Sequence, residues 1–209
     1  MLDAYIAPKL KPILLPIVKV LDRYKIHANH LTLVGFVFGI IGAILISMNC
    51  YLLGLMFILI NRLFDGLDGA LARLTQSQSA SGGFLDICLD FLFYASIPLA
   101  FAIANPQLNG LSAAILLATF IGTGSSFLAF AISAERFAIK NPVFSYKSFY
   151  YLNGLTEGTE TILFFCAFCL WPMYFPILAL IFSVLAGITI ITRIYFGFQT
   201  IKQKEQGAE

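Results

Sequence analysis

The chain has 209 residues, of which 59% are hydrophobic and only 11% are charged, whereas about 25% of the residues of soluble domains are charged. With 21 Phe and 9 Tyr, it has too few polar side chains to cover a water-soluble globule, so soluble, disordered and fibrous proteins are excluded. The formal charge is only +2 and no basic stripe with interleaved aromatic residues is visible, which argues against nucleic acid as a partner.

The first predicted element, residues 1–27, places apolar side chains near helical spacing and interrupts them with lysines and arginines. This pattern is typical of an amphipathic helix that lies in the membrane surface. We expect this surface helix to precede one membrane domain over residues 28–200 and a cytoplasmic tail over residues 201–209.

Six apolar runs follow, and each is predicted to be a transmembrane helix, which makes the fold all-α and polytopic. They cover residues 31–48, 50–60, 84–104, 111–134, 159–170 and 175–198. The second run is too short to cross a hydrocarbon core about 30 Å thick. We therefore expect its helix to continue through Asp65, and the third helix to carry Asp86 and Asp90 on its first turns. Both helices would then bring carboxylates to the membrane edge.

Basic residues mark one side of this predicted domain. If the six helices alternate in direction, every Lys and Arg falls on one side, in residues 1–30, 61–82, 135–158 and the end of the chain, with Arg193 counted near the inner end of the last run. The opposite connections carry no charge. Because Lys and Arg accumulate in the short cytoplasmic loops of membrane proteins, we predict that both termini and the carboxylates face the cytoplasm. In a bacterium the membrane would be the inner membrane.

Four aspartates occur at the ends of two neighbouring predicted helices. Asp65 and Asp68 are three residues apart, and Asp86 and Asp90 are four apart, so each pair projects from one face of its helix. An acid at a membrane helix centre costs about 2.5 to 3.5 kcal/mol, so four acids need compensation. Pairing with Arg62 and Arg73 is the alternative, but two arginines cannot neutralise four acids. We therefore predict that they hold Mg²⁺ or Mn²⁺ against a phosphorylated substrate.

Small residues share the faces of these acids. Gly69 and Ala72 lie on the face of the first pair, with Arg73 at its margin, and Gly82 lies beside the second pair. Small side chains allow a ligand to approach the backbone, and Arg can donate two hydrogen bonds to one phosphate. The pattern therefore favours a phosphate-containing ligand.

A spaced motif in this region resembles the full signature of the CDP-alcohol phosphotransferases, six-span membrane enzymes of phospholipid synthesis. The motif is Asp65-x-x-Asp68-Gly69-x-x-Ala72-Arg73, eight residues, then Gly82-x-x-x-Asp86-x-x-x-Asp90. Upstream, Asn29-His30-Leu31-Thr32 resembles the Pro-Asn-x-Leu/Ile-Thr of that family, with Ala28 in place of Pro. A plain helix N-cap is the alternative role for Asn29.

The resemblance implies that the protein moves a phosphatidyl or related phospho-alcohol group from a CDP-linked lipid, most often CDP-diacylglycerol, to an alcohol, and releases CMP. It implies two divalent ions, Mg²⁺ or Mn²⁺, on Asp65, Asp68 and Asp86. Asp90 would chiefly be the general base and would also count among the metal ligands. The nucleotide-binding residues would be Asn29, Gly69, Ala72, Arg73 and Gly82.

The acceptor alcohol is not identified by the motif. Five residues outside it are candidates for binding the acceptor: Arg136, Lys140, Glu157, Glu160 and Arg193. The basic ones suit a phosphorylated acceptor and the acidic ones suit an amine such as choline, while solvated loop charge is the alternative for each. Asp90 is followed by Phe91 rather than by the Lys common in glycerol-phosphate-using members, which argues mildly against a phosphatidylglycerophosphate synthase.

Three other functions fit the acids less well. A cation-coupled transporter would carry its acids in broken helices or repeats at mid-membrane, whereas these acids lie at one edge. Aspartate-rich membrane prenyltransferases have more spans and two separated acidic motifs, and a non-catalytic scaffold has little reason to keep four acids. A homodimer stays open, because Gly122 and Gly124 permit close helix approach either within the fold or between subunits.

Overall fold

The computed structural model describes residues 3–137 and 156–206, and within them the side chains from residue 12 onward. In this part of the chain the regular structure is helical throughout. The helices are α1 (Asp3–Arg23), α2 (Ala28–Ser47), α3 (Tyr51–Leu74), α4 (Ala80–Ala104), α5 (Pro106–Arg136), α6 (Gly158–Leu170), the 3₁₀ helix η2 (Pro172–Tyr174) and α7 (Phe175–Gln206).

The six apolar runs all form helices, as predicted, and most of these helices extend beyond the apolar run. α3 continues without a break beyond its short apolar run, so it does carry the first aspartate pair. α5 starts earlier than expected, at Pro106, because the Asn105 side chain accepts a hydrogen bond from the Leu108 N–H at 3.1 Å and caps the helix. α7 ends later, since it extends through most of the segment expected to be a tail.

Four helical segments are long and apolar enough to cross a membrane: α2, α4, α5 and the joined η2 and α7. The chain is therefore an all-α integral membrane protein. α6 is apolar but has only 13 residues, and the second half of α3 carries charged side chains. Six spans therefore stay a prediction.

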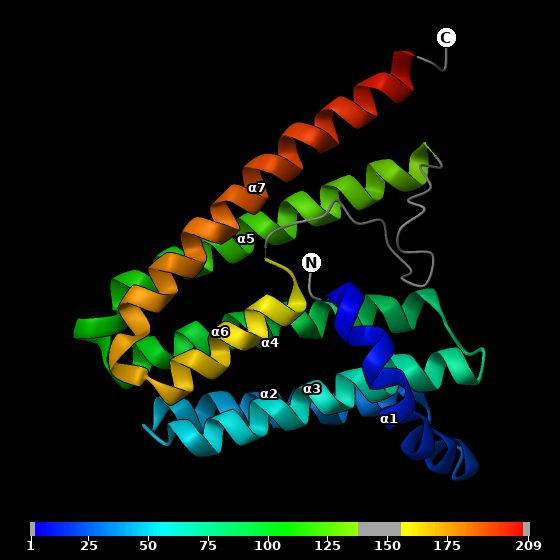
Figure 1. The fold of residues 1–209 in the computed structure, drawn as a ribbon, viewed down its shortest axis with the longest axis horizontal. Coiled ribbons are helices and arrows are strands. Elements are labelled where there is room, and N and C mark those ends of the chain that lie inside the picture. The colour runs from blue at the N-terminus through cyan, green and yellow to red at the C-terminus, as the bar shows by residue number, and fades with distance from the viewer. Residues whose placement is uncertain (1–2, 138–155, 207–209) are drawn as a thin grey trace.

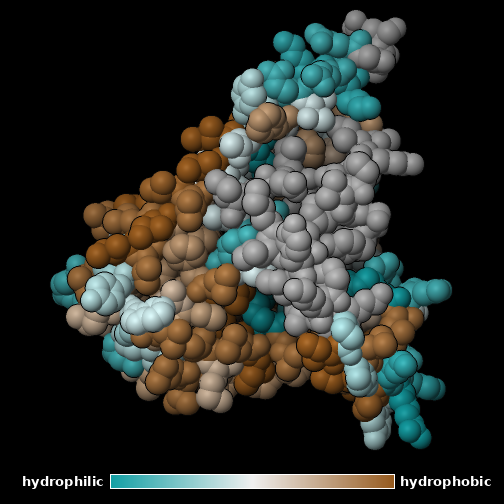
Figure 2. All heavy atoms as spheres, in the orientation of Figure 1, coloured by the Kyte–Doolittle hydropathy of each residue, from teal (hydrophilic) through white to brown (hydrophobic). Residues whose placement is uncertain are grey.

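The helices form two groups that diverge from one end of the molecule (Figure 1). α2 packs against both α3 and α4, and α5 packs along α7. α4 contacts α5, and α6 contacts α3 and α7, which joins the two groups. The N-terminal helix, the α3–α4 connection and the C-terminal end of α7 all lie toward the right-hand side of Figure 1. Most of the hydrophilic atoms in Figure 2 gather on that side.

Aromatic rings fill the core where the two groups meet. Phe101 stacks on Phe175 with ring centroids 4.4 Å apart, and both side chains are fully buried. Phe93, Phe165 and Phe168 extend this cluster toward the aspartates. Large apolar side chains also cover the outside of the helices, as Figure 2 shows in brown. This exposed apolar surface is what a lipid environment requires.

α1 packs across α3 near the end of the first helix group. Its Leu14 and Val18 side chains are buried against α2 and α3, whereas Ile13, Ile17 and Val20 are exposed. The helix therefore has one face on the protein and one apolar face outward. Its place in the membrane surface remains a prediction.

Candidate active site

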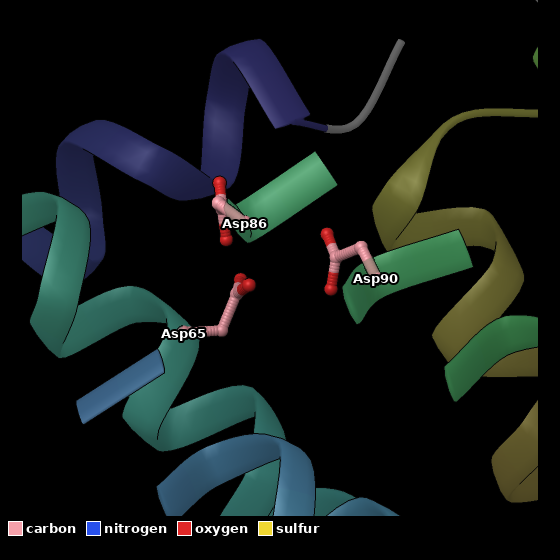
Figure 3. Close-up of side chains that lie close together, drawn as sticks. All are labelled: Asp65, Asp86 and Asp90. Atoms are coloured by element: carbon pink, nitrogen blue, oxygen red, sulfur yellow. The ribbon is translucent and has the colours of Figure 1, made fainter. Parts of the chain in front are cut away.

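Three of the four predicted aspartates meet between α3 and α4. Carboxylate oxygens of Asp65, Asp86 and Asp90 lie within 4.8 Å of one another, and Figure 3 shows the three side chains turned toward a common space. All three are partly exposed. They open into a small recess between α2, α3 and α4. The residues that line it are Thr32, Gly35, Phe36, Asn61, Arg62, Asp65, Asp68, Asp86, Leu89 and Asp90.

The carboxylates face each other because α2 packs against both of the helices that carry them. α3 and α4 are connected by only five residues, 75–79, and Ser79 caps α4 by accepting a hydrogen bond from the Gly82 N–H at 3.1 Å. Thr32, Gly35 and Phe36 of α2 form part of the recess wall. The α2 packing and the short connection together keep the two aspartate pairs at the same end of the molecule.

Asp68 lines the same recess but lies outside the group of three. Its Oδ2 accepts a hydrogen bond from the Thr32 hydroxyl at 2.6 Å, and the residue is only 6% exposed. Thr32 is the last residue of the upstream motif noted in the sequence. This hydrogen bond between α2 and α3 therefore links the upstream motif, which ends at Thr32, to the aspartate motif.

Arg62 was not predicted as a site residue, yet its guanidinium lies among the carboxylates. Its Nη2 donates to Asp90 Oδ1 at 2.8 Å, and its Nη1 lies 3.5 Å from Asp65 Oδ2. The salt-bridge alternative is therefore correct for Arg62. Arg62 and Asp65 are three residues apart on one helix, and this spacing was the signal that could have predicted Arg62 as a residue of the site.

Asn61 was also missed by the sequence analysis. Its side chain is buried, its Nδ2 donates to the Gly35 carbonyl at 2.8 Å, and its Oδ1 accepts from Arg62 Nε at 2.7 Å. Asn61 directly follows the apolar run of residues 50–60, and a polar side chain within a predicted membrane span is usually functional or paired, which was the available signal.

The donor set fits a hard divalent cation. Four carboxylates and one guanidinium leave a formal charge of −3 around the recess. Uncompensated like charges at these distances repel each other, and carboxylate oxygens are the ligands that Mg²⁺ and Mn²⁺ prefer. The three clustered aspartates are the residues best placed to hold such an ion.

The structure also places the predicted nucleotide-binding residues. A Cβ on Gly82 would lie 3.1 Å from Asn29 Oδ1, so these two residues meet where α2 and α4 begin. A Cβ on Gly69 would lie 3.1 Å from Arg73 Nη1, so the exposed Arg73 side chain folds back along α3, with Ala72 beside it. The N-cap alternative for Asn29 is wrong, because α2 begins at Ala28.

The predicted acceptor residues that the structure describes do not line this recess. Glu157 and Glu160 form a capping box at the start of α6, in which Glu160 Oε2 accepts from the Glu157 N–H at 3.1 Å. Arg193 is buried and donates to the Thr123 carbonyl at 2.9 Å. Arg136 is exposed at the end of α5. None of these four lines the recess, and Lys140 lies outside the residues that the structure describes.

Comparisons with known proteins identify the family of this chain. The family model of CDP-alcohol phosphatidyltransferases matches residues 25–195. The inner membrane protein YnjF of Escherichia coli K12 is 51% identical over 206 residues, which cover 99% of this chain and 100% of that protein. An archaetidylinositol phosphate synthase of Pyrococcus horikoshii is 36% identical over 100 residues, 48% of this chain and 53% of that protein.

Solved structures show the same fold. A crystal structure of the Mycobacterium tuberculosis phosphatidylinositol phosphate synthase PgsA1 with CDP-DAG bound has a TM-score of 0.72 at 20% identity, and covers 90% of this chain and 94% of that one. The same synthase with manganese and citrate has a TM-score of 0.68 at 21% identity and covers 88% of each chain.

Proposed function

Because the chain belongs to the CDP-alcohol phosphatidyltransferase family, it is a membrane phosphotransferase of phospholipid biosynthesis, and we propose that its donor is CDP-diacylglycerol. An alcohol attacks the phosphorus next to the diacylglycerol, a phosphodiester forms, and CMP leaves. The observation that carries this proposal is the meeting of Asp65, Asp86 and Asp90 in a recess that is open to the outside. The CDP-DAG bound to PgsA1, which shares the fold, supports the choice of donor.

The four aspartates of the motif have two proposed roles, metal binding and proton transfer. Asp65, Asp68 and Asp86 would hold two divalent ions, Mg²⁺ or Mn²⁺, and such ions orient a diphosphate and offset the charge of the leaving nucleotide. Asp90 counts among the ligands but acts chiefly as the general base that takes the proton of the acceptor hydroxyl. The manganese in the PgsA1 structure supports metal use here.

The nucleotide and the acceptor would approach from the same end of the molecule. Asn29 and Gly82, which meet at the start of α2 and α4, would contact the nucleotide together with Gly69, Ala72 and Arg73. Arg193 remains our strongest candidate for binding a phosphorylated acceptor, because its side chain is buried although it is charged. Arg136 and Lys140 are weaker candidates, and the helix cap already uses Glu157 and Glu160.

In the membrane, we expect the six helices α2 to α7 to cross and α1 to lie on the cytoplasmic surface, followed by one catalytic domain over residues 28–200. Both termini and the recess would face the cytoplasm, and in a bacterium the membrane would be the inner one, as for the relative YnjF. A homodimer fits this arrangement. A cation-coupled transporter, the alternative function, has no observation in its favour beyond the acids themselves.

The function is tested with the purified chain in lipid nanodiscs and CDP-diacylglycerol labelled in its cytidine. We expect labelled CMP to be released with one of a panel of alcohols, which includes glycerol phosphate, inositol phosphate, serine and choline. Release should need Mg²⁺ or Mn²⁺ and stop when EDTA removes them. Omission of the alcohol is the control for simple hydrolysis. No release with any alcohol in either metal would contradict the proposal.

A further inference from the structure

The Arg62 guanidinium is held in place by more than the acids beside it. Nη1 donates to the Tyr94 hydroxyl at 3.3 Å, Nε donates to Asn61 Oδ1 at 2.7 Å, and the group lies 4.7 Å from the centre of the Phe93 ring. Asn61 is itself fixed to the Gly35 carbonyl of α2. Contacts from α3 and α4 therefore fix the position of the Arg62 guanidinium, and Asn61 ties this arrangement to α2.

Arg62 contacts two carboxylates of the recess unequally. The 2.8 Å contact to Asp90 is a charge-assisted hydrogen bond, whereas the 3.5 Å contact to Asp65 is an ion pair without one. Asp90 Oδ1 thus accepts a hydrogen bond from the Arg62 guanidinium, which is itself fixed in position. The Asp90 carboxylate is oriented by this bond, and its other oxygen is left for another partner.

We propose that Arg62 is a positioning residue that holds Asp90 in place for proton transfer and limits how tightly the neighbouring carboxylates bind a divalent cation. The proposal rests on the proposed function and deepens it, because it names the residue that keeps Asp90 oriented as the base although Asp90 also counts among the ligands. Without Arg62, Asp90 would be free to turn toward the cation, and one positive charge would be lost from the recess. Both changes strengthen the binding of the divalent cation. Only the release of Asp90 also removes the oriented base.

This combination distinguishes positioning from simple structural support. A variant that merely loosens the fold should bind metal more weakly, because its ligands are less well ordered. A variant that only removes a positioning cation should bind metal more tightly and yet turn over more slowly. The two readouts therefore move in opposite directions only if Arg62 acts as proposed.

The test measures Mn²⁺ binding and turnover separately in nanodiscs. Free Mn²⁺ is followed by electron paramagnetic resonance without any substrate, and CMP release gives kcat and the KM for CDP-diacylglycerol. For Arg62→Met we expect Mn²⁺ to bind about tenfold more tightly, because a unit charge close to a divalent ion is removed. We expect kcat to fall about 100-fold while KM stays within about threefold.

Two variants serve as controls. Arg62→Lys keeps the charge but cannot hold Asn61, Tyr94 and Asp90 with one planar group, so Mn²⁺ affinity should stay near wild type and kcat should recover only in part. Arg23→Met removes an exposed positive charge from the last turn of α1 and should change neither quantity.

Unchanged or weaker Mn²⁺ binding by Arg62→Met, or an unchanged kcat, would overturn the proposal. If this variant does not fold, Tyr94→Phe decides, because it removes one hydrogen bond to Arg62: a lower kcat at constant KM supports the proposal, and an unchanged kcat overturns it. If the wild-type chain releases no CMP, the proposed function fails, and the Mn²⁺ series still tests the charge of Arg62 on its own.

Discussion

Asp68 and Asp90 each have one carboxylate oxygen engaged by a neighbouring side chain, Thr32 in the first case and Arg62 in the second. Among the ion pairs of the recess, Asp65 takes part in the longer contact to Arg62. Four aspartates that look alike in the motif thus have different surroundings. These surroundings are the reason to expect different results when each is replaced.

Asp90→Asn should abolish transfer and leave binding of the CDP-linked lipid largely intact, because an amide cannot accept the acceptor proton. Asp65→Asn should lose transfer and also weaken Mn²⁺ binding, because Asp65 is proposed as a metal ligand and, unlike Asp90, is not held by a hydrogen bond to Arg62. Transfer is measured with a radiolabelled acceptor, and Mn²⁺ binding without substrate. Full turnover by Asp90→Asn would refute its role as the base.

The arrangement of α3 and α4 depends on the close approach of α2 to both. A Cβ on Gly39 would lie 2.6 Å from Phe93 Cδ2 and 3.1 Å from Asn61 Nδ2, so α2 meets α4 and α3 at a point where no larger residue fits. Phe93 and Asn61 are also the residues that hold Arg62. Helix packing and the geometry of the site are therefore coupled through one glycine.

Gly39→Ala should destabilise the fold by about 1 to 3 kcal/mol, because the new methyl group must displace the Phe93 ring. A loss of this size lowers the melting temperature by several degrees, which thermal unfolding of the purified protein measures. Gly187→Ala is the matched control, since a Cβ at that position of α7 meets nothing within 4 Å. Equal melting temperatures for both variants would contradict the packing argument.

Across the whole molecule, α1, the α3–α4 connection and the C-terminal end of α7 lie toward one side, and the α2–α3 connection lies at the other (Figure 1). The aspartates of the recess belong to the halves of α3 and α4 that adjoin the α3–α4 connection. Apart from Arg193, which lies within the last predicted span, all lysines and arginines of the sequence fall in the segments that the topology prediction assigns to the first side. Polar nucleotide and acceptor would reach the recess from that side, while lipid chains remain among the apolar helix faces.

This topology predicts opposite accessibility for the two sides. In a cysteine-free background, a single exposed Cys50 at the α2–α3 connection should react with a membrane-impermeant maleimide in intact cells. A cysteine at the exposed Gln206 position should react only after the membrane is permeabilised. Labelling of Gln206→Cys in intact cells would place the terminus outside and overturn the map.

The sequence by itself determined the features that depend on local spacing. Hydropathy along the chain predicted each helix of the membrane domain, because burial in lipid demands apolar runs whose backbone bonds are internal. The three- and four-residue spacings predicted that each aspartate pair shares a helix face, which α3 and α4 confirm. The motif also predicted the family.

Only the tertiary structure decided which residues of different helices touch. The bond from Arg62 to Asp90, the bond from Thr32 to Asp68 and the approach of Asn29 to Gly82 each join residues that are far apart in the chain. Such contacts depend on how far one helix is shifted and rotated against the next. That register is set by side-chain packing, above all where α2 fits between α3 and α4, and no periodicity within a single helix encodes it.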